Sequence, residues 1–174
     1  MLIAASLVLK ALAMPLLARI GWVDFTTQKI ANRDVLLLLC VALGSLQLLS
    51  LHLGSWWNMG LSALAGLFLF VVLLPFWVLR KIGAGDVKLM AVMPLLIGSG
   101  DLTVFSVLLL VFAIAVAVIV KNPFLLPEGV FRFYVEHLDR KRVVPFGVVI
   151  SMASICTIAF QIYAILTPRP GPAI

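Results

Sequence analysis

Two acidic residues, Asp24 and Asp86, each lie at a border between an apolar run and a polar stretch. Carboxylates are costly in or beside hydrocarbon, so each one near an apolar run calls for an explanation. Two carboxylates that share a site cannot easily both ionise, so one keeps a proton while the other stays charged near neutral pH. The charged one can accept a proton from an attacking water, and the protonated one can donate to a carbonyl oxygen and later to the leaving amine. Such a pair indicates peptide hydrolysis that needs no metal and no organic cofactor.

The surroundings of Asp86 favour a site over an isolated charge. It lies in the stretch Gly83-Ala84-Gly85-Asp86-Val87-Lys88. We expect the two glycines to adopt backbone conformations closed to other residues and to let an extended substrate approach closely. A helix that starts here would help to hold Asp86 ionised through its dipole. The alternatives are a turn followed by an Asp N-cap, and a Lys88 that only sets the topology.

The other polar residues near apolar runs have simpler interpretations. Asp24 by itself could be an interfacial charge at the end of a helix. Asp34, just before the next apolar run, is predicted to be an N-cap, and it remains an alternative to Asp24 in the pair. Lys10, inside the first run, is expected to extend toward the outer surface.

The residue types that usually hold metals are scattered. His52 and His137 have no His or Cys partner at ligand spacing. Cys40 and Cys156 stand singly inside apolar runs and form no CxxC pair. We therefore predict no metal site and no disulfide framework.

The elements that must position the two carboxylates are membrane helices. The chain has 174 residues, of which 64% are hydrophobic and 11% charged, and its mean hydropathy is +1.22. These values exclude an ordinary soluble domain. Apolar runs predict six helices, near residues 2–22, 35–51, 59–79, 87–98, 102–120 and 143–166. The expected fold is an all-α integral membrane protein of about six transmembrane helices. We expect a single domain over residues 1–174, with no separate soluble or methyltransferase domain. We also expect no removable signal peptide.

The basic residues predict the orientation of these helices. Lys and Arg gather in cytoplasmic connections, and the connections after the first, third and fifth runs hold ten of the 13: Lys29, Arg33, Arg80, Lys81, Lys88, Lys121, Arg132, Arg140, Lys141 and Arg142. The alternate connections hold none, which places the N-terminus outside. If the short run at 87–98 did not cross, the five cations after residue 120 would lie outside. The net charge of +6 therefore reflects topology and not binding to nucleic acid.

This topology puts Asp24 and Asp86 at the same depth, at the inner ends of the first and fourth helices, so the two can meet. At this point the chain resembles the type IV prepilin peptidases, in particular the short form that serves Flp or Tad pili. Three motifs carry the resemblance: the stretch Asp24-Phe25-Thr26-Thr27-Gln28-Lys29-Ile30-Ala31-Asn32, the GxGDxK set Gly83, Gly85, Asp86 and Lys88, and Pro145-Phe146-Gly147. The family has Pro where this chain has Ala31, and Ala does not fix φ as Pro does.

The resemblance implies an aspartic endopeptidase with Asp24 and Asp86 as its catalytic pair and no cofactor. It also implies a site shaped by Gly83, Gly85, Lys88, Asn32, Pro145, Phe146 and Gly147. The substrate would be a prepilin or pseudopilin in the bacterial cytoplasmic membrane, cut on the cytoplasmic side between a short basic leader and a hydrophobic segment. Larger family members carry paired cysteines and methylate the new N-terminus. This chain has no such pairs, so we expect cleavage without methylation.

Three other functions fit part of the pattern. The carboxylates could relay protons or bind cations in a small transporter, although polar groups are sparse in the outer half. The chain could be a noncatalytic membrane protein of pilus or secretion assembly. It could also be a GxGD protease that cuts within a transmembrane helix, but the residues after Asp24 favour prepilin processing.

Overall fold

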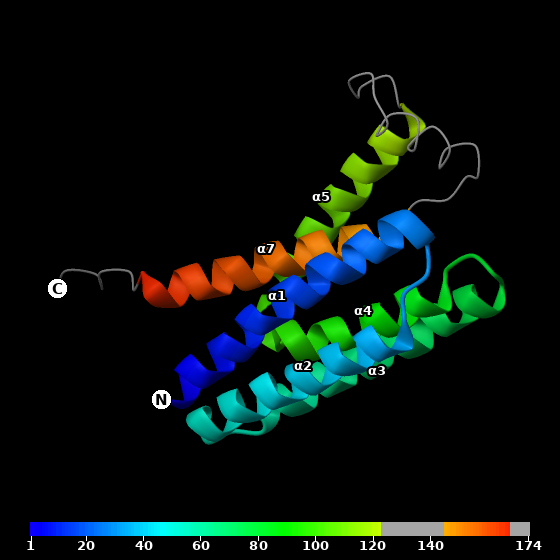
Figure 1. The fold of residues 1–174 in the computed structure, drawn as a ribbon. Helices are drawn as coiled ribbons and strands as arrows, with labels where there is room; N and C mark the ends of the chain where they lie inside the picture. The colour runs from blue at the N-terminus through cyan, green and yellow to red at the C-terminus, as the bar shows by residue number, and fades with distance from the viewer. Residues whose placement is uncertain (123–144, 168–174) are drawn as a thin grey trace.

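The computed structural model describes residues 1–122 and 145–167, and within these ranges it is all helical, as Figure 1 shows. The elements are α1 Leu2–Thr27, α2 Asn32–Leu53, α3 Trp57–Val78, α4 Ala84–Ile97, the 3-10 turn η1 Ser99–Asp101, α5 Leu102–Lys121 and α7 Phe146–Leu166. The prediction of an all-α membrane fold is confirmed. Most of the basic connection after α5 lies outside the described residues.

Five of the described segments are long and apolar enough to cross a bilayer: α1, α2, α3, η1 with α5, and α7. A crossing helix needs roughly 20 residues, and α4 has only 14. Even so, α4 connects the two ends of the bundle. Its first residues lie in one pocket with the last turn of α1, and its last residues lie in another with the first turns of α1. The chain is thus a multi-pass membrane protein, and a sixth crossing by α4 remains a prediction.

Several helices begin or end a few residues from the predicted positions, and for two of them the difference changes the place of an acidic residue. The apolar run ends at Trp22, but α1 continues through polar residues to Thr27, because a helix does not require apolar side chains beyond the hydrocarbon. Asp24 therefore lies in the last turn of α1 instead of closing it. Gln28, at φ 55°, ends the helix, and its N–H donates to the Asp24 carbonyl oxygen at 2.9 Å.

Likewise α2 begins at Asn32, so Asp34 is the third residue of the helix and the prediction that it is the N-cap was wrong. The capping position belongs to Ala31, which has φ −71° and ψ 133°. A proline fixes φ near −65°. Ala31 thus holds the geometry of the residue that it replaces in the family motif.

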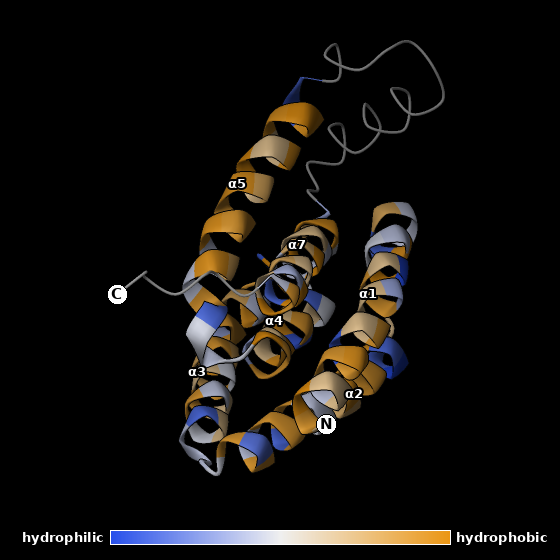
Figure 2. Ribbon diagram, turned by 90° about the vertical axis from the view of Figure 1, so that its left-hand side faces the viewer, coloured by the Kyte–Doolittle hydropathy of each residue, from blue (hydrophilic) through white to orange (hydrophobic). Residues whose placement is uncertain are grey.

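The helices pack around α1 and α4. In the bundle α1 lies between α2 and α7, while α4 contacts α2, α3 and α7. The core contains fully buried side chains such as Leu17, Leu38, Met93 and Ile150. By contrast α5 packs on α7 and leans away from α1 (Figures 1 and 2). The outward faces of α3 and α5 are apolar, as expected for helices against lipid (Figure 2).

A buried polar network fixes the end of α4 that is distant from Asp86. Lys10 extends toward this end of α4, as expected for the direction of its side chain, but it is only 7% exposed and does not reach the surface. Its Nζ donates to the Ile97 carbonyl oxygen at 3.1 Å and to Gln161 Oε1 at 2.8 Å. Gln161 Nε2 donates in turn to the same Ile97 oxygen at 2.8 Å and to Asp101 Oδ2 at 2.7 Å. Residues of α1 and α7 together hold the last carbonyl of α4.

Candidate active site

Asp24 and Asp86 lie together in a pocket of about 330 Å³ at one end of the bundle. The last turn of α1 and the residues that follow it form one wall, and the first turn of α4 forms the other. Its lining residues are Asp24, Gln28, Lys29, Ile30, Gly83, Ala84, Gly85 and Asp86. The fold thus brings together the two carboxylates, which are 62 residues apart in the chain.

The start of α7 holds the Asp24 carboxylate. Asp24 is only 5% exposed, and the backbone N–H of Val148 donates to its Oδ2 at 3.2 Å. Val148 lies in the first turn of α7, where backbone N–H groups and the helix dipole attract negative charge. Hydrogen bonds to a carboxylate favour its ionised form. Burial of the Asp24 side chain disfavours its charge, and this hydrogen bond offsets part of that cost.

Gly147 allows this contact because no side chain fits in its place. A Cβ at Gly147 would lie 2.7 Å from Asp24 Cγ, 2.8 Å from Oδ2 and 2.9 Å from Cβ. Pro145 is the buried N-cap residue of α7, and Phe146 is its first helical residue. The stretch Pro145-Phe146-Gly147 therefore starts a helix directly against Asp24.

Asp86 has a less favourable environment for its charge. It is half-buried in the first turn of α4, outside the five long apolar helices, and among the described residues its Oδ1 has no hydrogen-bond partner. Burial, and next the negative charge of Asp24, raise the pKa of Asp86 to about 6, and a backbone hydrogen bond from Gly83 opposes this only in part. The expected help from the helix dipole stays a prediction, because burial and the charge of Asp24 raise the pKa of Asp86 whether or not the dipole opposes them.

The two glycines before Asp86 provide space and not unusual backbone conformations. Gly83 has φ −69° and ψ 144°, which any residue adopts, and Gly85 has no positive φ. A Cβ at Gly83 would lie 3.0 Å from Asp86 Oδ2, and a Cβ at Gly85 would lie 2.8 Å from Ile30 Cβ. Gly83 leaves room for the Asp86 carboxylate, and Gly85 lets α4 start against the α1–α2 connection. The prediction that these two glycines adopt unusual backbone conformations was wrong. Both positions favour glycine because a Cβ would lie too close to a neighbouring side chain.

Asn32 and Lys88 meet beside this pocket. Lys88 Nζ donates to Asn32 Oδ1 at 3.0 Å, which ties the start of α4 to the start of α2. Both residues are exposed and neither lines the pocket. These two predicted site residues thus connect the helices beside the pocket and do not line it.

Asp34, the alternative partner, lies elsewhere. Its Oδ1 pairs with Arg19 Nη1 at 2.9 Å, and the Asp34 side chain is 3% exposed while that of Arg19 is 54% exposed. It does not line the pocket with Asp86. Arg19 was not singled out in the sequence, although its position inside the first apolar run could have signalled a buried acidic partner.

The described residues contain no group of three or more His, Cys, Asp or Glu side chains that could hold a metal ion. His137 lies outside the described residues. Chemistry without a metal thus remains a prediction that rests on the carboxylate pair.

Comparison with protein families gives a match. The family model described as the type IV leader peptidase family matches residues 11–120. The matched residues include Asp24, Gly83, Gly85 and Asp86 and end before Pro145. A comparison with curated proteins and another with solved structures found no match.

Proposed function

Because the chain belongs to the type IV leader peptidase family, we propose that it is an aspartic endopeptidase with Asp24 and Asp86 as its catalytic pair. One observation carries this proposal. Two carboxylates distant in the sequence share a pocket, and their surroundings differ. Asp24 accepts a hydrogen bond from a helix N-terminus, whereas Asp86 keeps a buried oxygen without a partner among the described residues.

This difference supports the following roles in hydrolysis. Asp24 is the general base that takes a proton from water as the water oxygen attacks the carbonyl carbon of the scissile bond. Asp86 is the general acid that donates its proton to the carbonyl oxygen. When the tetrahedral intermediate collapses, the C–N bond breaks, the amine leaves with the proton from Asp24, and one hydroxyl proton of the intermediate returns to Asp86 as the C=O bond re-forms. The water has then supplied the hydroxyl of the new carboxyl group and one proton of the new amine.

The substrate of this reaction is a prepilin or pseudopilin with a basic leader before an apolar segment. We place the pocket on the cytoplasmic side of a bacterial inner membrane, with the N-terminus of the chain outside. The cations around the pocket support this orientation, since Lys29 lines it and Lys88 lies beside it. The enzyme cleaves without methylating, because its two cysteines, Cys40 and Cys156, do not form the pairs that larger family members carry.

The packing of the core disfavours the transport alternative. A path for protons or cations from Asp24 to the network around Lys10 would pass the middle of α1 and α4. There Leu17, Leu89 and Met93 are fully buried and apolar. A transporter needs polar groups along its path, so the two polar ends of this bundle serve separate purposes.

Co-expression with a candidate prepilin tests the proposal by following leader removal as a loss of mass. We expect cleavage by the wild type, and at least a 100-fold loss in Asp24→Asn and in Asp86→Asn. Asp34→Asn is the matched control, because Asn can still accept the hydrogen bond from Arg19 outside the pocket. We expect it to cleave within a few-fold of wild type. Full activity in either pocket variant removes that carboxylate from the mechanism.

A further inference from the structure

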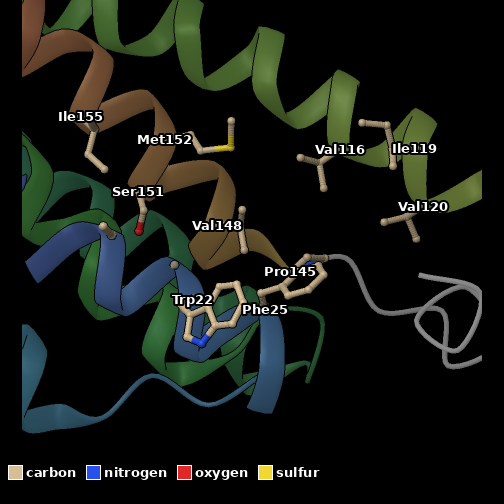
Figure 3. A pocket seen from close by; sticks show the side chains of 12 residues that line it. Trp22, Phe25, Val116, Ile119, Val120, Pro145, Val148, Ser151, Met152 and Ile155 are labelled. Carbon is tan, nitrogen blue, oxygen red and sulfur yellow. The ribbon is translucent and has the colours of Figure 1, made fainter. Parts of the chain in front are cut away.

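An apolar groove lies between α1, α5 and α7, as Figure 3 shows. It has a volume of about 440 Å³. None of the described residues that line it is charged: they are Ala18, Gly21, Trp22, Phe25, Val116, Ile119, Val120, Pro145, Val148, Ser151, Met152 and Ile155. The groove exists because α5 packs on α7 and leans away from α1 (Figures 1 and 2).

The groove is continuous with the surroundings of Asp24. Val148 lines the groove, and its backbone N–H donates to Asp24 Oδ2. Phe25, next to Asp24 in α1, lines it as well, and so does Pro145 at the start of α7. A chain that leaves the catalytic pocket along the Val148 side therefore enters an apolar space at once.

One polar side chain in the groove wall lies where α7 packs closely on α1, since a Cβ at Gly21 would lie 3.4 Å from Ser151 Oγ. Ser151 is 2% exposed, and among the described residues its Oγ has no hydrogen-bond partner. Buried hydroxyls in native structures nearly always have one. In membranes, Ser hydroxyls bond across to neighbouring helices, and small residues such as Ala18 and Gly21 let helices approach closely. Figure 3 shows Ser151 on α7 facing α1 within this wall.

From these observations we infer that the groove holds the apolar segment of the substrate that follows the scissile bond, bound as a helix. This inference rests on the proposed function and adds where the substrate docks. From Ala18 to Phe25 along α1, and from Val148 to Ile155 along α7, the walls extend over about 10 Å, or roughly two helical turns. The first two turns of the apolar segment occupy it, and their N-terminal end lies at Asp24.

A second groove, of about 650 Å³, lies between α2, α3 and α4, and its charge makes it a poorer dock. Asn32 and Lys88 line it at the end near the catalytic pocket, where Lys88 donates to Asn32. An apolar helix in this groove would cover the Lys88 ammonium, and removing a charge from water is costly. The α1/α5/α7 groove has no cation in its described lining. The second groove therefore supplies the matched control.

Cross-linking tests the docking without requiring catalysis. The enzyme carries Asp86→Asn to keep the substrate whole, Cys40→Ala and Cys156→Ala to remove its exposed thiols, and one new cysteine at Met152→Cys or at Leu67→Cys. Met152 lines the inferred dock, Leu67 lines the second groove, and both are exposed. The probe is a model prepilin with a basic leader, a roughly 20-residue apolar segment and one cysteine near the start of that segment. After oxidation in membranes, we expect at least about tenfold more disulfide with Met152→Cys than with Leu67→Cys.

Kinetics of the active enzyme provide a second readout. Met152→Trp fills the dock and should raise KM for the same probe about tenfold with little change in kcat, since it blocks binding and leaves the carboxylates in place. Leu67→Trp should leave both constants within about twofold. Equal cross-linking at both positions, or more cross-linking with Leu67→Cys, overturns the inference. So does the absence of a cross-link at either position, which indicates that lipid fills the groove. An unchanged KM in Met152→Trp also overturns it. If the wild type does not cleave at all, the proposed function fails, while the cross-linking result still reports on docking.

Discussion

Gly147 is the residue at which a single methyl group should disturb catalysis most directly. In Gly147→Ala the new Cβ would lie 2.7 Å from Asp24 Cγ, whereas an ordinary van der Waals contact begins at 3.4 Å. Asp24 and the start of α7 must therefore separate by about 0.7 Å, and a shift of roughly 1 Å in a catalytic group can lower a rate about 100-fold. We expect a 10- to 100-fold loss in the rate of leader removal.

The same shift weakens the hydrogen bond from Val148 N–H to Asp24, which is already 3.2 Å long. Overpacking of this kind lowers the free energy of unfolding by about 1–3 kcal/mol. The helix propensity of Ala over Gly offsets at most about 1 kcal/mol of that loss. Thermal unfolding of the purified protein measures the balance, and we expect a lower Tm.

Gly60→Ala is the control, because Gly60 lies in α3 and a Cβ there meets nothing within 4 Å. It should keep full activity and gain slightly in Tm. Asp24→Ala removes two of the three close atoms, Cγ and Oδ2, so adding Gly147→Ala to it should cost much less stability than in the wild type. Cleavage by Gly147→Ala within threefold of the wild-type rate, at an unchanged Tm, would refute the steric reasoning.

Three further predictions follow from residues around the helix ends. Ala31→Pro should raise the free energy of unfolding by about 0.4–1 kcal/mol at unchanged activity, because Ala31 already has φ −71°; a lower Tm would contradict this. The pKa of Asp86 is raised to about 6, so ionisation of Asp86 destabilises the fold as the pH rises from about 4 to above 6. Asp86→Asn should therefore unfold at a higher temperature than the wild type at pH 7.5, but not at pH 4. The size is about 1–2 kcal/mol once partial solvent exposure is allowed for, and an equal Tm difference at both pH values would exclude this cause. Lys10→Met should lower the free energy of unfolding by about 1–3 kcal/mol by leaving the buried Gln161 short of a partner, whereas the exposed Lys121→Met should leave Tm unchanged.

The helices and the meeting of the two carboxylates could be predicted because they depend on long apolar runs and on the distribution of cations. The end of α1 could not, since hydropathy reports where the hydrocarbon ends and not where the helix does. Asp24 consequently lies inside a helix, three residues before Thr27. The role of Gly83 was also misjudged, because a glycine pattern does not distinguish unusual φ values from a need for space.

Other features depend on contacts between distant segments. The pairing of Arg19 with Asp34 and the network of Lys10 with Gln161 each join two helices. A single sequence indicates that such charges need partners but not which partners they find. The lean of α5, which opens the apolar groove, likewise has no local signal in the sequence.

The brevity of α4 has a consequence for how water reaches the reaction. Fourteen helical residues extend over about 21 Å, whereas the hydrocarbon core of a bilayer is about 30 Å thick. The membrane adapts to a short helix by thinning around it, and the far end of α4 is pinned by Lys10. If α4 crosses the bilayer as predicted, we expect the thinning on the side of Asp86, with water extending there below the normal level of the headgroups. A peptide bond just outside an apolar helix can be hydrolysed at that depth without the helix leaving the lipid.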